Sequence, residues 1–119
     1  MKKLISELSE QEINYWVGQI EGINCSINHE GKCIRHLPLD VIIGPNDFMI
    51  YDPCNNHAQA WPIIQNNYIT VICSDNKSCA WDSKKGITSG VWKGNNGLIA
   101  AMRCRIAMVY GDSVEVDDE

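Results

Sequence analysis

The sequence lacks a long hydrophobic run, a basic excess and the hydrophobic segment of a signal peptide. No apolar stretch approaches the roughly 20 residues that cross a bilayer, and Lys2 and Lys3 are not followed by an apolar segment. We therefore expect a cytoplasmic protein with no membrane partner. The formal net charge of −5 argues against non-specific binding to nucleic acid, which needs a basic face, so we also expect no nucleic-acid partner. It does not exclude a local anion site.

Sequence motifs for catalysis are missing as well. There is no Walker loop, no G-x-G-x-x-G, no H-E-x-x-H and no G-x-S-x-G. The central carboxylates Asp47, Asp52, Asp75 and Asp82 stand apart rather than in pairs. These absences favour a binding protein over an enzyme, and they call for no cofactor.

The hydrophobic pattern predicts an α+β fold in a single domain, residues 1–119. We expect a small mixed or antiparallel sheet packed against an N-terminal and a C-terminal helix. The first helix is predicted at 10–21, because Ser9 and Glu12 form a capping box that precedes an apolar stripe. The last helix is predicted at 98–110. It is apolar on nearly all sides, which is typical of a core helix or a homodimer interface.

Between these helices the sequence predicts short strands and one interrupted helix. The clearest strand is 68–73, which is β-branched and aromatic, and weaker strands are expected at 48–51, 80–82 and 91–93. A hairpin is expected around residues 29–31. A further helix should begin after Asn55 or Asn56, run through Ala60 and restart at Trp61-Pro62.

Six cysteines in a chain without an export signal predict reduced thiols. Cys25, His29, Cys33 and His36 are all residue types that bind zinc, but their spacing matches no standard zinc motif, so no metal site is predicted.

Cys54 is a candidate nucleophile, because His57 follows three residues later and a helix N-terminus would favour the thiolate. The alternative is that Cys54 is only a small turn residue. A small cysteine-dependent hydrolase therefore stays open as a hypothesis.

Aromatic and amide side chains form the other candidate site. Tyr51 and Trp61 with Asn55 and Asn56 suit a pocket for a flat, polar ligand such as a nucleobase. Arg103 could pair with a phosphate group of that ligand. The alternatives are core positions for the aromatic residues and, for Arg103 and Arg105, a structural ion pair with a carboxylate such as Asp52 or Asp112.

Three segments carry a resemblance to a known family. They are residues 51–56 with 60–64 (YDPCNN and AWPII), 98–104 with 111–116 (LIAAMRC and GDSVEV), and the opening Ser6-Glu7-Leu8 with Val17, Glu21 and Gly22. Together these segments resemble the NinX-like proteins of tailed bacteriophages and prophages. The resemblance implies a phage accessory protein made inside the infected bacterial cell, and by itself it implies no biochemical activity.

The leading hypothesis is a phage accessory protein that acts against host defence by holding a small nucleotide-derived ligand. Trp61 or Tyr51 would stack on the base, Asn55 and Asn56 would bind its polar edges, and Arg103 would bind a phosphate. One alternative is an inhibitor that binds a host defence protein directly, with exposed tryptophans as anchors. The hydrolase based on Cys54 is the other.

Overall fold

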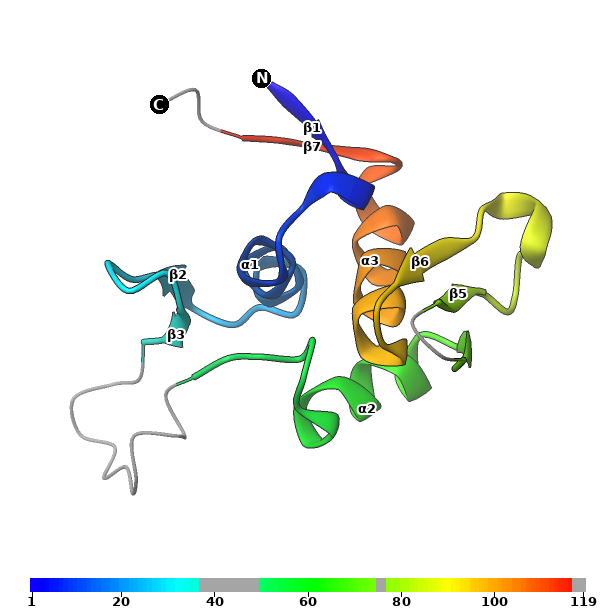
Figure 1. Cartoon of the computed structure of the whole chain (residues 1–119), viewed down its shortest axis with the longest axis horizontal. Coiled ribbons are helices and arrows are strands. Elements are labelled where there is room, and N and C mark those ends of the chain that lie inside the picture. The colour runs from blue at the N-terminus through cyan, green and yellow to red at the C-terminus, as the bar shows by residue number, and fades with distance from the viewer. Residues whose placement is uncertain (37–49, 75–76, 117–119) are drawn as a thin grey trace.

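The computed structural model describes residues 1–36, 50–74 and 77–116. Within these ranges three α-helices combine with small antiparallel sheets, which confirms the predicted α+β class (Figure 1). The elements in chain order are β1 (Lys2–Leu4), the 3-10 helix η1 (Ile5–Glu7), α1 (Glu10–Ile20), β2 (Cys25–Ile27), β3 (Cys33–Arg35), α2 (His57–Asn66), β4 (Ile69–Ile72), β5 (Ser78–Asp82), the 3-10 helix η3 (Ile87–Ser89), β6 (Trp92–Gly94), α3 (Gly97–Tyr110) and β7 (Ser113–Glu115). Across the described ranges, no helix has the length and apolarity that a membrane crossing requires.

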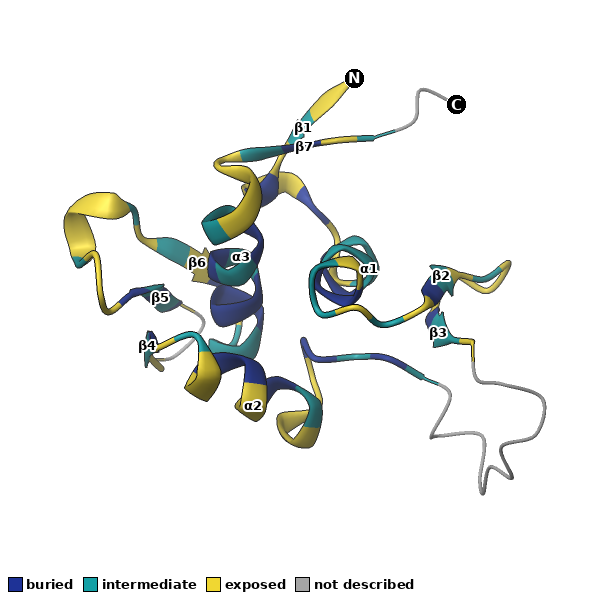
Figure 2. Ribbon diagram, turned by 180° about the vertical axis from the view of Figure 1, so that it is seen from behind, coloured by how far each residue is buried: buried dark blue, intermediate teal, exposed yellow. Residues whose placement is uncertain are grey.

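Helix α3 forms the centre of the core, as its nearly all-round apolar sequence allows. It packs between α1 on one side and the sheet β4-β5-β6 on the other, with α2 against its N-terminal half (Figure 1). Its buried residues are Ile99, Ala100, Ala101, Met102, Cys104 and Ile106, and buried residues follow the helix in Figure 2. Strand β6 approaches α3 closely, since a Cβ at Gly94 would lie 2.7 Å from the backbone nitrogen of Ala100.

The three-stranded sheet follows the sequence prediction with small shifts of boundary. Strand β5 lies in the middle and pairs antiparallel with β4 and β6. The hairpin expected around residues 29–31 is the antiparallel pair β2-β3. The predicted strand 48–51 lies partly outside the described residues, and Ile50 makes a single bridge to Ile34.

Two features differ from the sequence prediction. Helix α2 is continuous with Pro62 inside it, whereas the sequence predicts a restart at Trp61-Pro62. The proline forfeits one backbone hydrogen bond, and α2 tolerates the loss because Ala60, Ile63 and Ile64 are buried against the core. The chain ends also pair, since β1 and β7 form an antiparallel ribbon. This pairing of residues more than a hundred positions apart leaves no local sequence signal.

The predicted capping box of α1 is present. The Ser9 backbone N–H donates to Glu12 Oε1 at 2.9 Å, and the Glu12 N–H donates to Ser9 Oγ at 3.3 Å. Lys3 Nζ lies 2.9 Å from the same carboxylate. Burial raises the pKa of Glu12, but the hydrogen bond from Ser9 and the Lys3 ammonium outweigh it, so the pKa of this carboxyl is lowered.

We expect Glu12→Gln to lower the free energy of unfolding by roughly 0.5–1 kcal/mol at pH 7. A lowered pKa contributes stability that is present above the unfolded value, about 4.3, and is lost as the pH falls through the folded value. The difference between variant and wild type should therefore shrink at pH 3, as measured by urea denaturation. Glu7→Gln, a neighbouring exposed carboxylate in η1, is the control. An equal loss of stability in both variants would contradict the assignment.

Candidate functional site

The N-terminal ends of α2 and α3 open onto one groove of about 600 Å³, which we call the α2–α3 groove. Asn55, His57 and Trp61 line it from the α2 side, and Asn95, Asn96 and Gly97 line it from the α3 side. Its apolar floor consists of Ile64, Val71 and Leu98, and Cys73, Ser74 and Ser78 complete the lining. The groove therefore combines an aromatic wall, an apolar floor and two helix N-termini.

The start of α3 presents free backbone donors to the groove. Asn96 caps the helix, because its Oδ1 accepts from the Ile99 N–H at 2.8 Å and its carbonyl accepts from the Ala100 N–H at 3.2 Å. Within the described ranges, the N–H groups of Gly97 and Leu98 have no hydrogen-bond partner. No acidic side chain occupies the first turn of α3, so the positive end of the helix is not neutralised there.

The N-terminal end of α2 also lies at the groove and is capped in the same way. Asn56 caps it through a bond from the Gln59 N–H to Oδ1 at 3.2 Å, and its first turn also lacks an acidic residue. The Asn55 amide donates to Glu10 Oε1 at 2.7 Å, which leaves the Asn55 Oδ1 as its free acceptor. Both amides predicted to contact a ligand thus lie near the groove, but Asn56 is already committed to the helix cap.

Ser78 is the most deeply placed polar side chain in the groove. It is 2% exposed, it lines the groove, and its hydroxyl makes no hydrogen bond among the residues that the structure describes. A hydroxyl without a protein partner can both donate a hydrogen bond to a ligand in the groove and accept one from it. Ser78 could not be predicted from the sequence, because nothing near it in the chain distinguishes it from a surface serine.

Trp61 and Tyr51 differ sharply in exposure. Trp61 is 55% exposed on the wall of the groove, where its ring can stack on a ligand. Tyr51 is 4% exposed and packs so closely on Gly18 that a Cβ there would lie 3.3 Å from its ring. Burial, with Glu21 nearby, raises the pKa of Tyr51 well above its usual value. The stacking role predicted for Tyr51 is not available to a core side chain.

Arg103 holds the fold together rather than facing the groove. Its Nη1 donates to the Lys93 carbonyl at 2.6 Å and its Nη2 donates to the Leu8 carbonyl at 3.2 Å. These bonds tie α3 to β6 and to the N-terminal segment, and burial lowers the pKa of the guanidinium. Arg105 forms the structural ion pair that the sequence suggested, but with Glu21 at 2.8 Å rather than Asp52 or Asp112.

Cys54 and His57 do not form a nucleophile and base. Cys54 is 0% exposed, and its thiol points to the Glu10 carbonyl at 3.7 Å. Burial raises the pKa of this thiol strongly and the Asp52 carboxylate raises it further, which is the opposite of an activated thiolate. His57 is exposed and lines the α2–α3 groove instead.

Asn14 explains why the segment around Cys54 is held so tightly. It is 0% exposed; its amide donates to Asp52 Oδ1 at 2.9 Å and its Oδ1 accepts from the Cys54 N–H at 3.1 Å. Gln59 closes the same segment from α2, accepting from the Asp52 N–H at 2.6 Å. Asn14 was missed because it lies in an amphipathic helix, where a polar residue is ordinarily exposed, whereas Gln59 was predicted to contact a ligand and instead binds the backbone of Ile50 and Asp52.

The four residues considered for zinc are separated. Cys25 and Cys33 are buried side by side in the β2-β3 hairpin, whereas His29 is exposed and His36 shares a 2.6 Å hydrogen bond with Ser26 Oγ. In the part of the chain that the structure describes, no three His, Cys, Asp or Glu residues are placed to hold a metal ion.

Comparison with protein-family models gives one finding that bears on identity. The family described as Bacteriophage P22, NinX matches residues 4–109. The matched region contains every residue that lines the α2–α3 groove. It also contains α1, α2 and all of α3 except its last residue, Tyr110. No curated protein matches the chain.

Proposed function

The chain belongs to the bacteriophage P22 NinX family, and from this premise we propose that it holds a small nucleotide-derived ligand in the α2–α3 groove. In this proposal it acts in the cytoplasm of the infected bacterium, against host defence, and it binds the ligand without transforming it. The observation that carries the proposal is the meeting of one exposed tryptophan and two open helix N-termini in a single groove.

Trp61 would hold the base. Its ring is the exposed aromatic surface of the groove, and the floor beneath consists of Ile64, Val71 and Leu98. A base between such surfaces loses contact with water on both faces, and stacking on an aromatic side chain contributes about 1–3 kcal/mol per base. The Asn55 Oδ1 and the Asn95 amide lie at the rim, where they can bind polar edges of the base.

The start of α3 would hold the phosphate. The free N–H groups of Gly97 and Leu98 are donors of the kind that bind phosphate at helix N-termini, and the Ser78 hydroxyl adds a third. These donors take the phosphate-binding role that the sequence predicted for Arg103, whose guanidinium is bound to the carbonyls of Leu8 and Lys93. Gly97 itself allows close packing of α3 on β4, since a Cβ there would lie 2.6 Å from Cys73 Sγ and 3.1 Å from Val71 Cγ1; the phosphate would therefore be held by the backbone N–H groups alone on this side.

The test starts with native mass spectrometry of protein purified from its expression host, before and after denaturation. We expect a released mass of nucleotide size, and the same spectrum reports whether the protein is the homodimer that the apolar α3 suggested. Titration with a panel of mono-, di- and cyclic nucleotides then ranks the ligand class. Trp61→Ala should weaken the best ligand by about 5- to 100-fold, because the stacking contribution is lost.

Tyr68→Asn is the matched control for Trp61→Ala. Tyr68 is another exposed aromatic residue, it does not line the groove, and its positive φ of 54° is one that asparagine tolerates. Nucleotide affinity should not change in this variant. An empty protein that binds no nucleotide in the panel would contradict the proposal, and Trp61 would then be the anchor for a host defence protein instead.

A further inference from the structure

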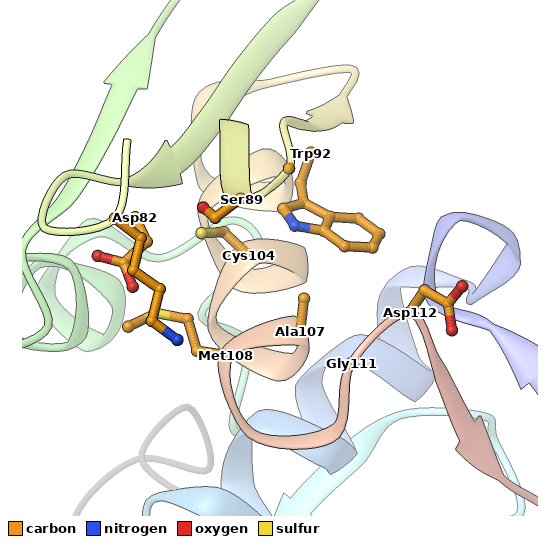
Figure 3. Close-up of a pocket in the computed structure, with 10 residues that line it drawn as sticks. Asp82, Ser89, Trp92, Cys104, Ala107, Met108, Gly111 and Asp112 are labelled. Atoms are coloured by element: carbon orange, nitrogen blue, oxygen red, sulfur yellow. The ribbon is translucent and has the colours of Figure 1, made fainter. Parts of the chain in front are cut away.

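A second, smaller cavity lies against the C-terminal half of α3, with a volume of about 200 Å³ (Figure 3). Asp82 at the end of β5, Ser89 in η3 and Trp92 in β6 form one wall. Cys104, Ala107 and Met108 from α3 form the other. We call it the Asp82–Trp92 cavity. None of the described residues lines both this cavity and the α2–α3 groove, so binding here does not depend on a nucleotide in the groove.

Asp82 places a largely buried carboxylate in the wall of this cavity. The residue is 8% exposed, and its Oδ1 accepts one hydrogen bond from the Lys84 N–H at 2.9 Å. Its Oδ2 has no hydrogen-bond partner, and no cation lies within ion-pair distance, among the residues that the structure describes. A carboxylate oxygen that has no protein partner and is accessible from the cavity favours the binding of a positive charge there.

The rest of the lining suits the same kind of ligand. Trp92 is half-buried across the cavity from Asp82, with Cys104 of α3 lying between them in Figure 3. An indole face attracts a cation through its ring electrons. Ala107 and the Met108 thioether offer an apolar surface to a short hydrocarbon chain. A second carboxylate, Asp112, stands at the exposed end of the cavity and disfavours anions.

We propose that the Asp82–Trp92 cavity binds a small primary alkylammonium ion. The ammonium group pairs with Asp82 Oδ2 and lies against the Trp92 ring, and a chain of a few carbons packs on Ala107 and Met108. The volume of about 200 Å³ excludes large or branched amines. Lys85 also lines the cavity but is exposed and forms no ion pair with Asp82 in the described chain, so its ammonium competes weakly with the ligand.

The test is a titration of the ¹⁵N-labelled full chain at pH 7 with n-butylammonium chloride, and in parallel with n-butanol. The readout is the indole N–H signal of Trp92, assigned through Trp92→Phe. We expect a saturable shift with n-butylammonium and at least a tenfold weaker response to n-butanol, which has the same chain without the charge. This comparison uses the wild-type protein and does not depend on the folding of any variant.

Two isosteric variants locate the charge. Asp82→Asn should weaken n-butylammonium binding by about tenfold or more, whereas Asp112→Asn, which removes an exposed carboxylate from the same cavity, should change it less than about threefold. Lys85→Met should strengthen binding. Equal shifts with n-butanol and n-butylammonium, no saturation, or the same loss of affinity in both aspartate variants would overturn the proposal.

Discussion

Alkylation of the native protein at pH 8 is expected to modify Cys73 at least about a thousandfold faster than Cys54. Only the thiolate reacts, so every unit by which a pKa rises removes about a factor of ten in reactive species. Burial and the Asp52 carboxylate raise the pKa of Cys54, and the side chain is fully enclosed, whereas Cys73 is exposed. A time course with iodoacetamide, followed by peptide mass spectrometry, measures both rates in one sample.

Cys33 and Cys104 serve as internal references, because burial raises the pKa of each thiol to about 12 and both should react slowly. In concentrated urea all six thiols should react at similar rates. Rapid native alkylation of Cys54 would restore the hydrolase hypothesis, in which His57 acts as its base. Since Cys73 lines the α2–α3 groove, a nucleotide bound there should slow its alkylation, while that of Cys79, outside the groove, stays unchanged.

The helices at both ends of the chain could be predicted from the sequence because their signals are local. The capping box of Ser9 and Glu12 placed the start of α1 at Glu10 as observed, and the last helix was predicted within one residue of α3. Strands β4, β5 and β6 were found through β-branched and aromatic residues. The β1-β7 ribbon was missed, since its partners are far apart in sequence and the pairing depends on how α1 and α3 pack.

The candidate site could be predicted only in part, because exposure is decided by tertiary packing. Trp61 and Tyr51 carry the same aromatic signal in the sequence, yet one lines a groove and the other fills the core. The sequence of residues 94–97 predicts only a turn between a strand and a helix, whereas in the fold Asn95, Asn96 and Gly97 line the α3 side of the groove. Arg103 was assigned to a phosphate because its two carbonyl partners, Leu8 and Lys93, come from distant segments.

Asn14→Leu is expected to lower the free energy of unfolding by about 2–4 kcal/mol, the largest loss that we expect from a single substitution outside the hydrophobic core. Leucine has the same number of side-chain heavy atoms and the same branching but cannot donate to Asp52 or accept from the Cys54 N–H. The variant therefore leaves a buried donor unpaired and removes a charge-assisted bond. For a chain of this length the melting temperature should fall by roughly 10–15 °C, as measured by circular dichroism.

Gln19→Leu is the matched control, because it also replaces a side-chain amide of α1 with leucine, but at an exposed position, and should leave stability within about 0.5 kcal/mol of wild type. A double-mutant cycle with Asp52→Leu separates the two lost bonds. If Asn14 acts through Asp52, the double variant should lose less stability than the two single variants together. Strict additivity would contradict this coupling.

Since the Asp52 carboxylate also accepts from the Asn55 amide at 3.2 Å, the same variants should loosen the α2 side of the groove and weaken nucleotide binding, whereas Gln19→Leu should not.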